Sequence, residues 1–143
     1  MSERAESLKT ALGERIISLE ERSPKRIYIE VAPENLVSIA SYLFNDLGAR
    51  LATVSGMEME REFEVLYHFA LDPEHRLVML RVRLAKDNPK VPSLANLIKG
   101  AEFIEREIHE LLGIDFPDHP NLKPLLLPED WPEGVYPLRR EKR

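Results

Sequence analysis

Apolar residues change from helical to strand-like spacing and back over the first 48 positions of the chain. Leucines and isoleucines recur every three or four positions over residues 3–21, which predicts one helix ended by Ser23-Pro24. Alternating apolar side chains over residues 26–32 predict a strand. Pro33 suits the first turn of a second helix, and Gly48 supplies its stop.

Three strand candidates follow, at residues 49–59, 61–71 and 76–84. The last two predict an antiparallel hairpin around the turn 72–75, whose Asp-Pro-Glu-His sequence favours a turn. One register places Glu64 opposite Arg83, a favourable cross-strand pair. The same register gathers eight apolar residues on one face: Phe63 opposite Leu84, Val65 opposite Val82, Tyr67 opposite Leu80, and Phe69 opposite Val78.

A third helix is expected at residues 101–112, after a short turn at 94–98 and before a stop at Gly113. Six prolines then disfavour regular structure in residues 114–143. The chain therefore predicts an α+β fold, a small antiparallel or mixed sheet with packed helices, over residues 1–113. Residues 114–143 are expected to form a long extended tail that docks on its own domain and on a partner subunit.

Composition narrows the classes of function. There is no cysteine, so thiolate chemistry, iron–sulfur ligation and disulfides are excluded. The net charge is −5 and no basic run occurs, which argues against nucleic-acid binding. Glutamine is absent while Glu, Lys and Arg are abundant, a composition typical of thermophiles. No apolar run is long enough for a membrane span or a signal peptide, so we expect a cytoplasmic location.

A zinc site is the first chemistry to consider. His109-Glu110 begins the H-E-x-x-H pattern of zinc enzymes, but Gly113 stands where the second histidine is required. His119 falls where an extended motif has its third ligand, yet Phe116 replaces the turn glycine of that motif. We therefore expect no metal site and place His109 on the solvated surface of the helix.

Acid–base chemistry is the second possibility. Glu105, Glu107 and Glu110 share one helix but point to different sides, so they form no catalytic pair. Glu107 borders the apolar stripe, which leaves two alternatives: a half-buried carboxylate paired with Arg139 or Arg140, or a carboxylate that reaches water. No glycine-rich phosphate loop or nucleophile elbow occurs. No catalytic, cofactor-binding or small-molecule substrate site is predicted.

The tail is too apolar for a solvated end. Its apolar residues are Leu122, Leu125, Leu126, Leu127, Trp131, Val135, Tyr136 and Leu138. The interspersed prolines stiffen the segment and reduce the entropy lost when it docks. Part of it is expected to wrap its own domain, and the remainder to bind a partner.

Residues 91–141 closely resemble the signature region of the thirty-kilodalton subunit of respiratory complex I. They equally resemble the corresponding small subunit of membrane-bound nickel–iron hydrogenases. The matching elements are Val91-Pro92-Ser93, Gly100-Ala101, Glu105-Arg106-Glu107, Leu112-Gly113-Ile114, His119-Pro120, the run from Leu126 to Trp131, and Pro137-Leu138-Arg139. Two departures are Phe103-Ile104, where the family often has an aromatic pair, and Tyr136 to Glu141, where the family usually reads His-Pro-Leu-Arg-Lys-Asp.

The resemblance implies a cofactor-free structural subunit, peripheral on the cytoplasmic face of the membrane. Its implied partners are a hydrogenase-type large subunit, an iron–sulfur small subunit and, indirectly, membrane subunits. Iron–sulfur clusters, and in a hydrogenase a nickel–iron centre, would belong to those partners. The residues assigned to the partner interface are Glu105, Arg106, Glu107, Ile114, His119, Pro120, Leu122, Leu126, Leu127, Asp130, Trp131, Pro137, Leu138 and Arg139.

Trp131 is the strongest anchor candidate, and its replacement by alanine is expected to cost more than about 2 kcal/mol of binding.

Length and composition favour a hydrogen-evolving hydrogenase or a close sulfur-reducing relative. The alternative is a complex I type NADH- or ferredoxin-linked quinone reductase. A third alternative, from another class, is a free-standing anion-binding module or small enzyme that uses Arg81, Arg83 and the acidic helix.

Overall fold

A mixed five-stranded sheet with strand order β1-β2-β5-β4-β3 forms the centre of the molecule. The computed structural model describes residues 1–123, 126–127 and 130–139. Its strands are β1 (Ser18–Ser23), β2 (Arg26–Glu30), β3 (Arg50–Glu58), β4 (Glu62–Leu71) and β5 (Arg76–Ala85). Only the central β2–β5 pair is parallel. The helices are α1 (Glu3–Leu12), α2 (Leu36–Ser41) and α3 (Ala101–Leu112). The α+β prediction is thus confirmed.

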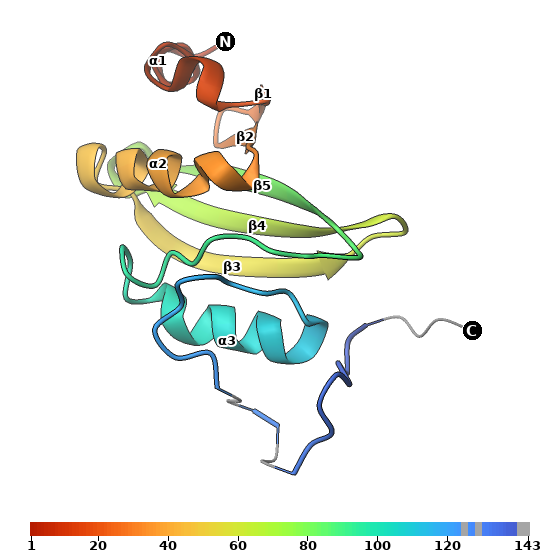
Figure 1. The fold of residues 1–143 in the computed structure, drawn as a ribbon. Coiled ribbons are helices and arrows are strands. Elements are labelled where there is room, and N and C mark those ends of the chain that lie inside the picture. The colour runs from red at the N-terminus through yellow and green to blue at the C-terminus, as the bar shows by residue number, and fades with distance from the viewer. Residues whose placement is uncertain (124–125, 128–129, 140–143) are drawn as a thin grey trace.

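The β4–β5 hairpin has the predicted register, with Phe63 opposite Leu84. All eight apolar residues of the predicted face are at most 4% exposed, so this face forms the core. Glu64 lies opposite Arg83 as predicted, but its carboxylate pairs diagonally with Arg81 at 3.0 Å. Helices cover the apolar face, whereas the other face carries mostly polar or partly exposed side chains, although Met79 is buried there. The architecture therefore has two layers (Figure 1).

The predicted helix over residues 3–21 is wrong in its second half. The helix ends at Leu12 because Gly13 adopts a φ of 53°, a conformation that glycine tolerates and that helices do not contain. A single turn of 3₁₀ helix follows (Gly13–Arg15), and residues 18–23 form the edge strand β1. Pairing with β2 thus overrides the helical spacing of Ile16 and Leu19, both of which pack half-buried against the core.

The second helix lies where the sequence places it but is irregular. A 3₁₀ turn (Pro33–Asn35) leads into α2, and a π-helical segment (Tyr42–Asp46) continues it to Gly48. The third helix has the predicted bounds, with Gly113 as its stop, and a turn at residues 94–98 precedes it. Among the described residues no helix is long and apolar enough to cross a membrane.

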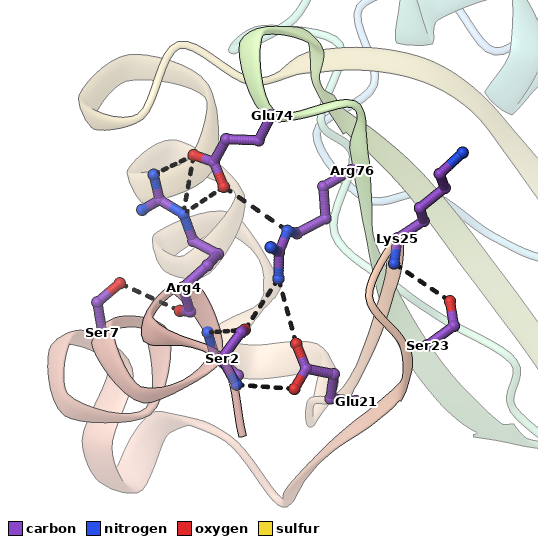
Figure 2. Close-up of polar contacts among 9 residues, drawn as sticks. Ser2, Arg4, Ser7, Glu21, Ser23, Lys25, Glu74 and Arg76 are labelled. Atoms are coloured by element: carbon purple, nitrogen blue, oxygen red, sulfur yellow. Dashed lines mark hydrogen bonds and ion pairs between the residues drawn. The ribbon is translucent and has the colours of Figure 1, made fainter.

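A polar cluster fastens α1 to the sheet (Figure 2). Arg76 of β5 donates to Glu21 at 3.2 Å and to the Ser2 hydroxyl at 2.9 Å. Arg4 of α1 pairs with Glu74 in the turn between β4 and β5. Ser2 also caps α1 by accepting from the Ala5 N–H at 3.1 Å. These contacts join the first residues to strands far along the chain.

Gly56 lets α3 approach β3 closely. A Cβ atom added at Gly56 would lie 2.9 Å from the Ile108 Cγ2 atom and 3.1 Å from the Leu112 Cδ1 atom. Both residues belong to the apolar stripe of α3 and are buried. A strand glycine is normally unfavourable, but here its missing side chain makes room for the helix. This contact sets the position of α3, on which the candidate site is built.

Gly56→Val should therefore push α3 away from the sheet. Overpacking of this kind costs about 1–3 kcal/mol, and the Tm should fall by roughly 3–9 °C. Thermal unfolding followed by circular dichroism measures this change. Gly100→Ala is the matched control, because nothing lies within 4 Å of the added Cβ, and its Tm should stay close to that of the wild type. Equal Tm values for both variants and the wild type would contradict the close approach.

Candidate partner interface

Helix α3 and the segment that follows it form the candidate interface. They lie at the opposite end of the molecule from α1 (Figure 1). Two of the predicted interface residues, Glu105 and Ile114, are buried in the chain's own fold, and so is the side chain of His119. The others are partly or fully exposed: Arg106, Glu107, Pro120, Leu122, Leu126, Leu127, Asp130, Trp131, Pro137, Leu138 and Arg139. The sequence analysis therefore assigned both buried and exposed residues to one interface, and the structure distinguishes the two groups.

Glu105 is the most deeply buried acid of the described residues, with no exposed surface. Its carboxylate accepts from the Ser93 hydroxyl at 2.5 Å and from the Leu94 N–H at 2.8 Å. Ser93 in turn accepts from the Ala95 N–H at 3.0 Å. Burial raises the pKa of Glu105, while the Leu94 and Ser93 hydrogen bonds partly oppose that rise. Glu105 thus ties the loop at residues 91–98 to α3.

His119 closes this cluster without forming a catalytic triad. Its Nε2 atom donates to the Glu102 carbonyl at 2.9 Å, and its Nδ1 atom accepts from the Asn121 N–H at 2.9 Å. Those two bonds fit the neutral imidazole protonated at Nε2. The 3.9 Å separation between His119 and Glu105 is therefore not an ion pair, and the Ser93 hydroxyl bonds to the acid rather than to the imidazole. The cluster is structural.

Glu110 performs the corresponding task for the tail. It is 6% exposed, and its two carboxylate oxygens accept from the Leu126 and Leu127 N–H groups, each at 2.7 Å. Hydrogen bonds to a charged acceptor are about twice as strong as neutral ones. This carboxylate therefore holds the leucine run of the tail against the helix. Sequence reasoning missed the role because the acid lies away from the apolar stripe.

Two arginines add further tethers. Arg106 donates to the Lys123 carbonyl at 2.9 Å, and Arg139 donates to the Leu112 carbonyl at the end of α3, also at 2.9 Å. The Tyr136 ring packs so closely on Gly113 that an added Cβ would lie 2.5 Å from a ring carbon. Gly113 also has a φ of 77°, so both space and backbone conformation require glycine there. The tail thus returns to the helix end.

Glu107 is exposed, so of the two alternatives for this residue the carboxylate that reaches water is observed. Arg140, one of the two arginines considered as its partner, lies outside the described residues, as does Leu125 of the tail.

His109 differs from its predicted solvated position, because it is half-buried and its Nδ1 atom donates to the Ile114 carbonyl at 2.8 Å. Within the described ranges no three histidine or acidic side chains gather in a way that would hold a metal ion.

The anion-binding alternative finds little support. Arg81 pairs with Glu64 at 3.0 Å, and Arg83 pairs with Glu62 at 3.0 Å and with Glu30 at 3.4 Å. Both guanidinium groups are thus already neutralised by carboxylates of the same sheet. An external anion would have to compete with these partners.

The outer surface of this region carries several large apolar side chains. Large apolar side chains are exposed on α3 and the tail: Phe103 by 57%, Leu126 by 60%, Trp131 by 38%, Val135 by 49% and Leu138 by 62%. Between α3 and the tail lies a cavity of about 360 Å³, lined by Glu110, Leu127, Trp131, Glu133 and Tyr136 among others. Exposed large apolar side chains of this kind are typical of surfaces that contact another protein.

Glu110→Ala should release the leucine run of the tail without unfolding the domain. Loss of two charge-assisted hydrogen bonds should lower the hydrogen-exchange protection of the Leu126 and Leu127 amides by about tenfold or more. Site-resolved exchange by NMR measures this. Glu107→Ala on the same helix is the control and should leave both amides protected. Unchanged protection in the Glu110→Ala variant would rule out the tether.

Glu105 should give the fold a pH dependence. Its folded-state pKa is raised, so the folded protein binds this proton more tightly than the unfolded chain does. The resulting stability is fully present below the ordinary pKa of 4.5 and is lost as pH rises through the folded-state pKa. Glu105→Gln replaces the ionisable carboxyl group with an amide that does not titrate. As the pH rises from 4.5 to 8, the Tm of the wild type should therefore fall relative to the Tm of the variant. A constant difference across that range would contradict the assignment.

Comparison with known proteins identifies the family. Residues 29–143 match the family described as "Respiratory-chain NADH dehydrogenase, 30 Kd subunit". A subunit of the NADH-quinone oxidoreductase of Roseiflexus sp. (strain RS-1) is 38% identical, over 95% of this chain and 80% of that protein. A subunit of the F(420)H(2) dehydrogenase of Methanosarcina mazei is 37% identical, over 95% of this chain and 87% of that protein.

Two solved structures share the fold. A chain of the membrane-bound sulfane sulfur reductase, an archaeal respiratory membrane complex, aligns with a TM-score of 0.82 at 18% identity, over 95% of this chain and 83% of that chain. The trypsin-resistant fragment of Nqo5 aligns with a TM-score of 0.69 at 22% identity, over 82% of this chain and 97% of that chain. The predicted resemblance is confirmed: this chain belongs to the 30-kDa subunit family of respiratory-chain NADH dehydrogenase, and is thus a subunit of a complex I-type assembly.

Proposed function

We propose that the chain is a docking subunit, without a redox centre of its own, in the peripheral arm of a membrane-bound oxidoreductase. Its task is to hold the hydrogenase-type large subunit in place, next to the iron–sulfur small subunit. The supporting observation is the apolar surface of α3 and the tail, which the chain's own carboxylates and arginines fix in position. A surface held in this way loses little entropy on binding.

The arrangement of tethers supports docking rather than catalysis. The polar groups around α3 are used to fasten the chain to itself: Glu105 to the loop at 91–98, Glu110 to the leucine run, and Arg139 to the helix end. The exposed groups of α3 and the tail include five large apolar side chains, a kind of group that fills the core of a protein interface. Electron transfer and any metal chemistry would then belong to the partners.

The relatives favour a quinone reductase, which was the alternative in the sequence analysis. Those relatives are named as subunits of NADH-quinone oxidoreductase and F(420)H(2) dehydrogenase. A hydrogen-evolving hydrogenase, which length and composition favoured, stays a prediction. The free-standing enzyme is the weakest of the three, because Arg81 and Arg83 are paired within the sheet.

Gentle affinity purification of the tagged chain from its own membranes, with mass spectrometry and metal analysis, tests the proposal. We expect a large subunit, an iron–sulfur subunit and multi-helix membrane proteins to be recovered together. Iron without nickel would support the quinone- or sulfur-linked branches, and nickel would favour the hydrogenase branch. Recovery of the chain alone would refute the docking role.

A matched pair of surface variants locates the contact. Leu138 in the tail and Ile17, which directly precedes β1, are each 62% exposed. In Figure 1, β1 lies next to α1, at the other end of the molecule from α3. Leu138→Asn should weaken binding to the large subunit by about tenfold, as expected for an anchor residue, and Ile17→Asn should not. Trp131→Ala is less specific, because the indole N–H donates to the Val135 carbonyl at 2.8 Å and so shapes its own loop. Quantitative pull-down with purified partner measures both variants.

A further inference from the structure

A cavity lies between α3 and the tail among the described residues. Its volume of about 360 Å³ lies near the lower end of the range for ligand pockets, which suits a single large side chain better than a free cofactor. Its lining residues include the aromatic Trp131 and Tyr136, the acidic Glu110 and Glu133, and His109. Among the described lining residues there is no lysine or arginine.

This combination of rings and carboxylates is the chemistry that recognises a cation. The face of an aromatic ring attracts a cation, most strongly for tryptophan, and a carboxylate adds charge complementarity. The surroundings strengthen the preference, since residues 101–143 carry ten acidic and six basic side chains. The chain also shows the contact internally, because the Arg139 guanidinium lies 4.9 Å from the centre of the Tyr136 ring and 5.0 Å from that of Phe63.

The walls of the cavity are held in place before anything binds. Glu110 fixes Leu127 through the backbone, and the hydrogen bond from the Trp131 indole to the Val135 carbonyl fixes the orientation of the ring. The Leu138 N–H donates to the Leu111 carbonyl at 2.9 Å, which anchors the far side of the loop to the helix. Pre-organised walls reduce the entropy lost on binding.

We propose that this cavity, the cation socket, receives the guanidinium group of an arginine from a neighbouring subunit. The proposal rests on the docking role proposed above and adds the chemistry of one contact within it. An arginine fits better than a lysine, because a planar guanidinium stacks on the indole while it pairs with a carboxylate. Glu133 is the exposed carboxylate among the lining residues, and it is the group expected to pair with the guanidinium.

The chain alone allows a direct test, because the printed sequence has a single tryptophan, Trp131, whose fluorescence reports on the socket. The probe is N-acetyl-arginine methylamide, and the neutral control is N-acetyl-citrulline methylamide, which has nearly the same shape. Saturable change of Trp131 emission by the arginine probe, at concentrations where the citrulline control has no effect, is expected. Equal responses to both compounds, or no saturable response, would overturn the proposal.

Substitutions that remove a charge but keep the side-chain shape test whether charge drives binding of the arginine probe. Glu133→Gln should weaken binding of the arginine probe about threefold, as expected for one exposed charge, and Glu14→Gln at the far end of the molecule should leave it unchanged. Equal affinities for Glu133→Gln and wild type would count against the socket. Tighter probe binding after Arg140→Gln, Lys142→Gln and Arg143→Gln together would assign the socket to this chain's own cations and overturn the partner contact.

The probe measurement needs no partner, so it can fail independently of the proposed function. If the large subunit is recovered with the chain but the arginine probe does not bind, the docking role stands and the cation socket is refuted. If the probe binds with the expected charge dependence but no partner is recovered, the docking role is refuted. The cavity then remains a cation-binding site, but its assignment to an arginine of a neighbouring subunit is refuted as well.

Discussion

Burial of the Glu105 carboxylate is the constraint on which the rest of the candidate site depends. A fully buried acid without hydrogen bonds would cost several kcal/mol, so the fold must supply donors. It does so with the Ser93 hydroxyl and the Leu94 N–H, and this brings the loop at 91–98 onto α3. Once that loop and Gly56 of β3 have set the position of the helix, the next carboxylate, Glu110, holds the tail. The candidate interface is thus built outward from buried carboxylates.

Strands with one buried face were predictable because their pattern specifies a register. In the β4–β5 hairpin a shift by one residue would move every apolar side chain to the wrong face, so the alternation of Val65 and Tyr67 with Glu64 left a single solution. The first helix was not predictable to the same degree. Ile16 and Leu19 continue a helical spacing, and only the conformation of Gly13 and the pairing of residues 18–23 with β2 end it.

The acids of α3 show why the site was only partly predictable. When angles around the helix axis are measured from the Ile104 side chain, Glu107 lies nearer the apolar stripe than Glu105 does. Measured from the buried Ile108, Glu105 lies about 60° away and Glu107 about 100° away on the other side. The choice of reference residue therefore decided which acid was expected to be buried. No choice of reference residue would have predicted the role of Glu110. The residues that bind its carboxylate lie in a tail without regular periodicity, about 16 residues farther along the chain.

The three consecutive residues Glu105, Arg106 and Glu107 explain why a short motif can carry several tasks. Successive side chains of a helix point about 100° apart, so neighbours in sequence face different surroundings. Glu105 faces the loop at 91–98, Arg106 reaches the tail at the Lys123 carbonyl, and Glu107 faces water. One helical turn thus joins the core, the tail and the exposed surface. A change at any of the three would act through a different physical route, on stability, on the shape of the interface or on its charge.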